Sequence, residues 1–187
     1  MKKLTYIFTW LSVCIMMGCG GKKADNKAEE RQIFQIDSVD ENTGVQRMQT
    51  SHIDQTIECK GKKFRLVINR VPDSSLPIVK STMGTFADNR IHVKITRDNG
   101  TQLFAKSFTK SDFAAHLPND YLRESVLEGL VFDDVKSANN KEITLAASVS
   151  YPMTDLYVPF TLVISQSGTL SLAKDEDMGE LTPMEEE

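Results

Sequence analysis

The sequence lacks the motifs that most directly reveal a function. Its 187 residues contain no internal repeat and no GxSxG, Walker or GxGxxG pattern. His52, His92 and His116 are the only histidines, and none lies in an HExxH pattern or beside a cysteine at metal-ligand spacing. These absences exclude the enzyme classes that such motifs identify. We therefore expect no catalytic residue, no metal and no cofactor, and a protein that is not an enzyme.

Long hydrophobic runs are also absent. The longest mainly apolar stretch, residues 4–17, is shorter than the about 20 residues that a membrane-spanning helix needs. It follows Lys2-Lys3 and ends before the small residue Gly18, which is the order of regions in a secretory signal peptide. We therefore expect residues 1–18 to act as a signal peptide that is removed on export.

The residues around the expected cleavage site add a second signal. Met16-Met17-Gly18-Cys19 resembles a bacterial lipobox, with methionine where leucine is commoner. The resemblance implies cleavage before Cys19, a diacylglycerol thioether on its sulfur and an acyl group such as palmitate on its amino group. Each buried methylene contributes about 0.8 kcal/mol, so two or three chains anchor a protein stably. A cut before Cys14 fits less well because Val13 is bulky; the alternative is an ordinary secretory signal with an incidental cysteine.

Loss of the signal leaves a chain poor in cysteine, tryptophan and positive charge. Cys59 would be the one unmodified cysteine, so no internal disulfide can form, and it fits a small buried hydrophobe better than a nucleophile. Trp10, the only tryptophan, would also be removed. Loss of Lys2 and Lys3 reduces the 22 basic residues to 20, against 26 acidic ones, for a net charge of −6. This charge disfavours nucleic acid as a partner.

Composition divides the mature chain into three parts. Residues 19–32 join the lipidated cysteine to a polar segment that is typical of a flexible tether. Residues 176–187 form an acidic tail that we expect to be disordered. Residues 33–175 have the size and the apolar content of a single domain.

Alternation of apolar and polar residues through this domain predicts strands. Asn99-Gly100 suits a tight turn between two such strands, and Lys60-Gly61 suits another, with Phe64, Leu66 and Ile68 on one face of the strand that follows. Further strands are expected at 31–39, 131–137, 141–151 and 157–165, with a last hairpin that turns at 167–168.

One segment, residues 109–130, breaks the alternation. Ser111 can cap a single turn that ends before Pro118, and a helix is expected from Asn119 to Glu128. Its apolar face would consist of Leu122, Val126 and Leu130, with Gly129 as the C-terminal cap.

These elements predict a mainly β (α+β) fold, either an antiparallel β-sandwich or a partly closed barrel, with one short covering helix. Pro159 favours the start or the edge of a strand over a central position. The lipobox, the polar tether, the hairpin at 93–113 and the closing strands at 158–175 together resemble small outer-membrane lipoproteins of the Bacteroidetes type, of a domain-of-unknown-function family. The resemblance implies an outer-membrane lipoprotein with a β-rich fold and carries no activity.

Candidate functional residues are few. Lys60, Lys62 and Lys63 gather at one turn, where they could bind an anionic partner or simply protect a strand edge from pairing. Asp37-Ser38-Val39 resembles a short signal for O-glycosylation of exported proteins, which makes Ser38 a candidate modification site. Asp133 and Asp134 would face opposite sides of a strand and therefore form no carboxylate pair.

Taken together, the sequence favours a non-enzymatic binding or accessory module of the cell envelope, anchored by lipid in the outer membrane, on its periplasmic or its cell-surface face. Its partner would be an envelope protein or a small ligand. The alternatives are an exported hydrolase with an unrecognised active site and a structural or assembly factor of an envelope complex. Loss of Trp10 weakens a glycan-binding role. Three tyrosines could still stack on a sugar, namely Tyr121, Tyr151 and Tyr157.

Overall fold

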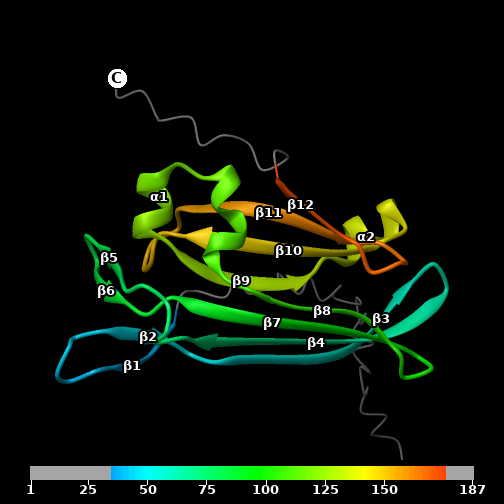
Figure 1. Ribbon diagram of the computed structural model, residues 1–187, viewed down its shortest axis with the longest axis horizontal. Coiled ribbons are helices and arrows are strands. Elements are labelled where there is room, and N and C mark those ends of the chain that lie inside the picture. The colour runs from blue at the N-terminus through cyan, green and yellow to red at the C-terminus, as the bar shows by residue number, and fades with distance from the viewer. Residues whose placement is uncertain (1–34, 176–187) are drawn as a thin grey trace, which may run out of the picture. The chain divides into compact units, whose positions relative to one another are not determined.

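The computed structural model describes residues 35–175. Two four-stranded sheets face each other and share one hydrophobic core, and a third, smaller sheet lies at one end (Figure 1). The expected mainly β fold, in its sandwich form, is confirmed.

The first large sheet has the strand order β3-β4-β7-β8 and is antiparallel throughout. Both expected hairpins are part of it. Lys60 and Gly61 make the β3–β4 turn with φ angles of 51° and 68°, whereas at the β7–β8 turn only Gly100 has a positive φ, 82°. Its four strands are β3 (Ser51–Cys59), β4 (Lys62–Pro72), β7 (Asn89–Arg97) and β8 (Gln102–Phe108).

The second large sheet has the order β12-β11-β10-β9 and is also antiparallel. The expected last hairpin joins β11 to β12. A Cβ on Gly168 would lie 2.4 Å from the carbonyl oxygen of Leu103, so the close approach of this turn to β8 requires glycine. The strands are β9 (Val126–Phe132), β10 (Ile143–Ser150), β11 (Tyr157–Ile164) and β12 (Leu170–Lys174).

Pro159 lies within β11, an inner strand of this sheet, rather than at a strand start or on an edge strand. Its carbonyl accepts a hydrogen bond from the N–H of Asp175, one residue beyond the end of β12. In a strand the nitrogen and the carbonyl of one residue point to the same side, so the proline nitrogen faces the place where β12 has ended. The missing N–H of Pro159 therefore removes no hydrogen bond between β11 and β12.

The small sheet was not expected from the sequence beyond its first strand. Its order is β1-β2-β6-β5, and the pairing of β2 with β6 is parallel. A separate apolar cluster of Met48, Val79, Phe86 and Val126 joins it to the start of β9. The strands are β1 (Ile36–Val39), β2 (Gln46–Met48), β5 (Val79–Ser81) and β6 (Gly84–Phe86).

A short 3₁₀ helix, η1 (Lys110–His116), follows β8 and closes one side of the core. Phe113 of this helix is fully buried, with its ring 4.8 Å from that of Phe160 in β11. The expected single turn before Pro118 is therefore confirmed. Its capping residue is Thr109 and not Ser111, since the N–H of Thr109 donates to the carboxylate of Asp112 at 2.8 Å.

The expected helix from Asn119 to Glu128 is wrong in its second half. Helix α1 ends at Glu124 and contains no buried residue, and the chain from Val126 onward is strand β9. Residues four apart share a face in a helix and also in a strand, so Leu122, Val126 and Leu130 fitted both structures. Gly129 is a strand residue opposite Ser148, not a helix cap, and glycine disfavours a helix interior.

The strand expected at 131–137 is correspondingly displaced. It ends at Phe132, and helix α2 (Asp134–Asn140) follows. Asp133 caps this helix, accepting a hydrogen bond from the N–H of Lys136 at 2.7 Å. Asp133 and Asp134 thus lie at a helix start and not on a strand. The expectation that they face opposite sides of a strand is therefore wrong.

Arg70 connects the two large sheets at one end of the core. It is 8% exposed, and its guanidinium donates to the carbonyls of Glu128 at 2.6 Å and Gln49 at 3.0 Å. Glu128 is the extra residue of a β-bulge, because Leu127 pairs with Val149 and Gly129 with Ser148. The buried arginine therefore satisfies a carbonyl that the bulge leaves without a partner strand.

The remaining expectations about the chain ends concern residues outside the described range. The signal peptide, Cys19, the tether and the acidic tail all lie beyond residues 35–175, and the domain boundaries stay predictions. Within the described range, no helix has the length and apolarity needed to span a bilayer.

Candidate functional site

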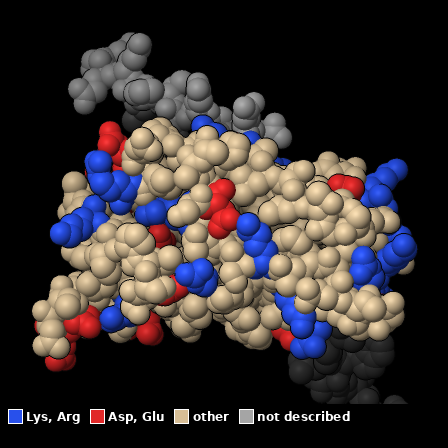
Figure 2. Space-filling view, viewed as in Figure 1, with Lys and Arg blue, Asp and Glu red and all other residues tan. Residues whose placement is uncertain are grey.

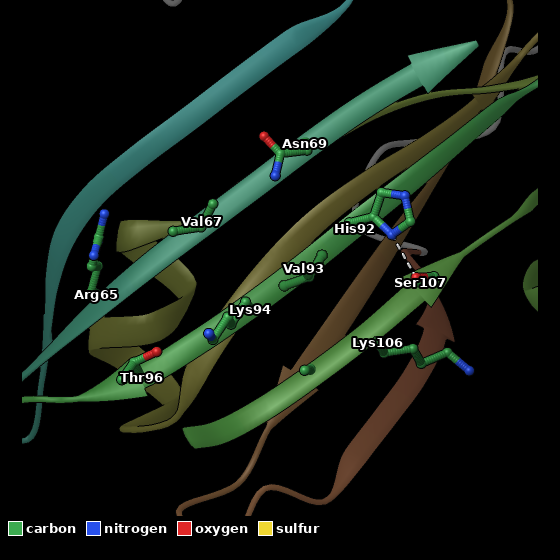
Figure 3. Close-up of a pocket in the computed structure, with 10 residues that line it drawn as sticks. Arg65, Val67, Asn69, His92, Val93, Lys94, Thr96, Lys106 and Ser107 are labelled. Carbon is green, nitrogen blue, oxygen red and sulfur yellow. Dashed lines mark hydrogen bonds between the residues drawn. The ribbon is translucent and has the colours of Figure 1, made fainter. Parts of the chain in front are cut away.

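One hollow of the described surface lies on the outer face of the sheet β3-β4-β7-β8, turned away from the core. Its volume is about 620 Å³, and residues of β4, β7 and β8 line it (Figure 3). The strands bring these residues together because alternate side chains of a strand point to the same face. Pairing in register then places one side chain from each strand in a row across the sheet.

Two such rows form most of the hollow. One row runs across β3, β4, β7 and β8 as His52, Asn69, His92 and Ser107. The next row has the same strand order and consists of Asp54, Val67, Lys94 and Ala105. The hollow thus combines polar side chains with an apolar strip made by Val67 and Ala105.

Positive charge dominates its lining. Arg65 and Lys94 point outward from β4 and β7, and no carboxylate is among the lining residues (Figure 3). Lys106 also borders the hollow but turns its Nζ away, to pair with Asp112 at 2.8 Å (Figure 3). Lys94 is exposed and makes no ion pair with any described residue.

Arg65 is held in place by a neighbour on β3. Its Nε and one terminal nitrogen donate to the two carboxylate oxygens of Asp54 at 2.8 and 2.5 Å. This paired hydrogen bond from Arg65 lowers the pKa of Asp54, and the same bond raises the pKa of Arg65. Arg65 is therefore a fixed cation at the border of the hollow, whereas Lys94 is free to turn toward a ligand.

His92 and Ser107 form the polar end of the hollow. Nδ1 of His92 lies 2.6 Å from Oγ of Ser107 (Figure 3), and on the same row Nδ1 of His52 contacts Oδ1 of Asn69. A serine nucleophile needs a base that a further group orients, usually a carboxylate. None of the described residues offers a carboxylate to His92, so the pair is a set of hydrogen-bonding groups rather than a catalytic triad.

A second hollow, of about 220 Å³, lies between the β5–β6 turn and the loop after β10. Met83 and Leu156 line it and are 51% and 49% exposed. Tyr121 lies close by, with its ring 4.5 Å from that of Tyr151 and its hydroxyl donating to the carbonyl of Val149. Burial raises the pKa of Tyr121. Neither tyrosine lines the larger hollow, so neither can stack on a ligand bound there.

The candidate residues from the sequence are spread over the molecule. Lys60, Lys62 and Lys63 lie at the β3–β4 turn, and Lys and Arg side chains gather at this end in Figure 2. Ser38 is exposed on β1, which leaves its modification a prediction. Cys59 is buried, and burial raises the pKa of its thiol, as expected of a small core residue.

Sequence reasoning missed the face that makes the hollow. It expected a strand here, and His92 is exposed on the outer face of that strand. It did not align that strand with its neighbours, so Asn69, Lys94 and Ser107 were not recognised as a group. The two expected hairpin turns would have supplied the register, because each turn fixes which residues lie opposite each other.

No three histidine, cysteine or acidic side chains within residues 35–175 lie close enough together to hold a metal ion. No curated protein matches the chain. The sequence profile of a domain of unknown function, DUF4738, matches residues 30–172, which include nearly all of the two large sheets and every residue that lines the larger hollow. The chain therefore belongs to the family of the domain of unknown function DUF4738.

Proposed function

We propose that the protein is a non-enzymatic binding module of the cell envelope, held at the outer membrane by lipid on Cys19. Its ligand would carry carboxylate, sulfate or phosphate groups and would bind on the outer face of the sheet β3-β4-β7-β8. The signal-like residues 1–18 and the lipobox-like residues 16–19 support the location. The hollow on the sheet supports the binding role.

One observation carries the choice of ligand. The hollow is lined by Arg65 and Lys94 and by no acidic residue, although the whole chain has a net charge of −4. Arg65 is paired with Asp54, so the excess positive charge of the hollow comes from Lys94, and a local excess of this kind on a negatively charged protein concentrates anions there. Lys94 supplies a charge with no internal partner, so binding an anion there breaks no ion pair.

The shape of the hollow favours an extended ligand. It is open to solvent along a sheet surface and lies over three strands, unlike an enclosed pocket that buries most of a small molecule. Asn69, Thr96 and Ser107 supply hydrogen-bonding groups for hydroxyls or amides between the charged points. An acidic glycan of the envelope fits this combination better than a neutral one, because no tyrosine or phenylalanine lines the hollow for stacking.

A hydrolase role has less support. The contact between His92 and Ser107 is the one arrangement that resembles a nucleophile and its base. It lacks an orienting carboxylate among the described residues and lies on an open sheet surface, where water is not excluded. The binding role needs none of these missing groups.

Titration with oligosaccharides tests the ligand class. The full chain with Cys19→Ser, which lacks the lipid, is mixed with a sulfated chondroitin hexasaccharide and, separately, with a neutral dextran of similar length. We expect binding of the sulfated probe alone, weakening as salt is added because salt screens charge. Backbone NMR shifts should concentrate on β4, β7 and β8.

Two lysine variants make the test specific. Lys94→Glu should weaken binding of the sulfated probe at least tenfold, and Lys80→Glu should leave it within twofold. Lys80 is the matched control because it is an exposed lysine on β5, outside the hollow, and has no ion pair with a described residue. Equal effects of the two variants, or equal binding of dextran, would reject the proposed site.

Location is tested independently. Mass spectrometry of the membrane-extracted protein should find an N-terminal Cys19 that carries acyl chains, and Cys19→Ser should release the protein into the soluble periplasmic fraction. A soluble wild-type protein that begins at another residue would reject lipid anchoring at Cys19. It would leave the proposed ligand binding unaffected. The same spectra test for a sugar on Ser38, which we also propose as a modification site.

A further inference from the structure

Strand β3 has a long edge that pairs with no other described strand. β3 has nine residues and pairs with β4 over its whole length, without a register shift, and with no other described strand. It carries neither proline nor lysine. A long, regular edge of this kind presents a row of unpaired N–H and C=O groups that another strand can bind (Figure 1).

The other edges of the two large sheets are protected. β8 has a register shift and an inward-pointing lysine, Lys106, whose Nζ lies 5.2 Å from the centre of the Phe108 ring. β9 carries the bulge at Glu128, and β12 has only five residues. These features are the usual means by which proteins prevent edge-to-edge pairing. Their absence from β3 alone suggests that this edge pairs with something.

The β3–β4 turn determines which groups point outward. A two-residue turn of Lys60 and Gly61 is closed by the bonded pair Cys59 and Lys62. Bonded residues alternate along an antiparallel pair, so every second residue back from Cys59 bonds to β4. The N–H and C=O groups of the residues between them therefore point to the free edge, and these are His52, Asp54, Thr56 and Glu58.

This edge is complementary to itself. When a second copy of β3 runs antiparallel with Gln55 opposite Gln55, the outward-bonding residues meet in pairs: His52 with the second copy's Glu58, and Asp54 with the second copy's Thr56. Ile53 then lies beside the second copy's Ile57 on the other face. A cross-strand pair of opposite charge or of two apolar residues is favourable, and this register contains no pair of like charges.

The neighbouring registers are worse. Moving the second copy by one step in either direction, while keeping the same side chains on the same face, places Asp54 opposite Asp54 or opposite Glu58. Like charges directly opposite each other on adjacent strands are destabilising. Gln55 and Glu58 are exposed, and Glu58 has no ion pair with a described residue, so both are accessible.

We propose that the partner of this edge is a second copy of the chain, joined through β3 about a two-fold axis at Gln55. The two four-stranded sheets then form one continuous sheet across the dimer. Both hollows face the same side of it, so an extended ligand could contact two sites at once, which raises its apparent affinity. The dimer does not depend on the ligand proposal, since it uses backbone groups of β3 outside the hollow's lining.

A cysteine at the axis gives the most direct test. Gln55 is a non-bonded pair in the proposed dimer, where the two Cα atoms are about 4.5 Å apart, a spacing that accepts a disulfide. In full chains with Cys14→Ser and Cys19→Ser, Gln55→Cys should form a disulfide-linked dimer under mild oxidation. Gln102→Cys is the matched control, because Gln102 is an exposed glutamine on β8, the other edge strand of the same sheet. Equal linkage of the two variants would reject the proposal.

Charge exchange tests the register by analytical ultracentrifugation. Glu58→Lys should raise the dimer dissociation constant about tenfold, since it removes the pair with His52 twice in each dimer. The double variant His52→Glu with Glu58→Lys places a negative charge opposite a positive charge at each of these pairs and should recover wild-type affinity. A wild-type protein that stays monomeric at millimolar concentration overturns the proposal, and so does a double variant no tighter than Glu58→Lys.

Discussion

The two faces of the sheet β3-β4-β7-β8 are built from alternate residues of the same four strands, yet they differ in nearly every physical property. On the inner face, Leu66, Ile91 and Ile95 are fully buried against the opposite sheet. On the outer face, Lys94 and His92 are exposed and surround the hollow. Stability is therefore concentrated on one face and chemical variety on the other.

This separation shows how a small fold without disulfides can carry a binding surface. The core spans both large sheets and also includes η1, so no outer-face residue is needed to hold the sheets together. Residues on the outer face can then be selected for a ligand at little cost in stability. Most of the predictions below compare a residue on the inner face or at its border with one on the outer face.

The largest expected difference is between adjacent residues of β4. Leu66→Ala should lower the free energy of unfolding by about 2–5 kcal/mol, because it removes buried methyl groups and leaves a cavity. Val67→Ala, on the half-buried outer face, should cost about 1 kcal/mol or less. Urea unfolding followed by far-ultraviolet circular dichroism measures both, with an unchanged m-value as the check on two-state behaviour. Similar costs would mean that the outer face is also covered.

Two arginines of β4, one buried and one exposed, allow the same comparison for polar groups. Arg70 donates to two backbone carbonyls in the core, and burial lowers its pKa, whereas Arg65 pairs with Asp54 in solvent. Arg70→Met should cost about 1.5–3 kcal/mol, because the bulge carbonyl of Glu128 loses its charged donor. Arg65→Met should cost much less than Arg70→Met, because exposed ion pairs contribute little to stability.

The measurement is again the urea midpoint of the two variants. A large loss for Arg65→Met would indicate that its pair with Asp54 helps to hold β3 on the sheet. A negligible loss for Arg70→Met would show that the carbonyls of Glu128 and Gln49 are hydrated instead. Methionine keeps much of the volume of arginine, so the comparison isolates the hydrogen bonds from packing.

The difference between the two faces also explains which features of the fold could be predicted from the sequence. Phe64, Leu66 and Ile68 were correctly placed together on one face, because period-two alternation reports directly on which face is buried. The two turns at Lys60-Gly61 and Asn99-Gly100 were identified by their turn chemistry. Local signals of this kind depend on neighbouring residues only, and they located both hairpins of the first large sheet.

The misses required information from distant parts of the chain. Val126 and Leu130 lie on β9 because β10 pairs with that segment, with Leu130 in the main core and Val126 in the separate cluster beside the small sheet. Their spacing alone fits a helix equally well. The parallel pairing of β2 with β6 joins segments that no hairpin connects. The hollow was missed for the same reason, since Asn69, Lys94 and Ser107 meet only through the pairing of three strands.

Acid should reduce the contribution of Asp73 to the stability of the folded state. Hydrogen bonds from Ser75, and then the contact with Arg90, lower the pKa of Asp73 to about 2 from an ordinary value of 3.8. A carboxylate with a lowered pKa stabilises the folded state fully above pH 4, and this contribution is lost as pH falls from about 4 to about 2. Asp73→Asn should therefore be less stable than wild type at pH 7.

The difference between these two proteins should shrink toward zero near pH 2, because Asp73 itself is then protonated. Thermal unfolding midpoints measured between pH 7 and pH 2 give both curves. Parallel curves over the whole range would show that Asp73 does not titrate differently in the folded and unfolded states. Such a result would mean that the ion pair between Asp73, which follows β4, and Arg90 on β7 does not stabilise the folded state.

The smallest expected effect is at the centre of the hollow. Lys94→Ala should change the free energy of unfolding by about 0.5 kcal/mol or less, because Lys94 is exposed and has no ion pair with a described residue. Ile95→Ala, one residue along β7 but fully buried, should cost about 2–5 kcal/mol in the same urea titration. A substantial loss would instead assign Lys94 a structural role, and the argument that its charge is available to a ligand would fail.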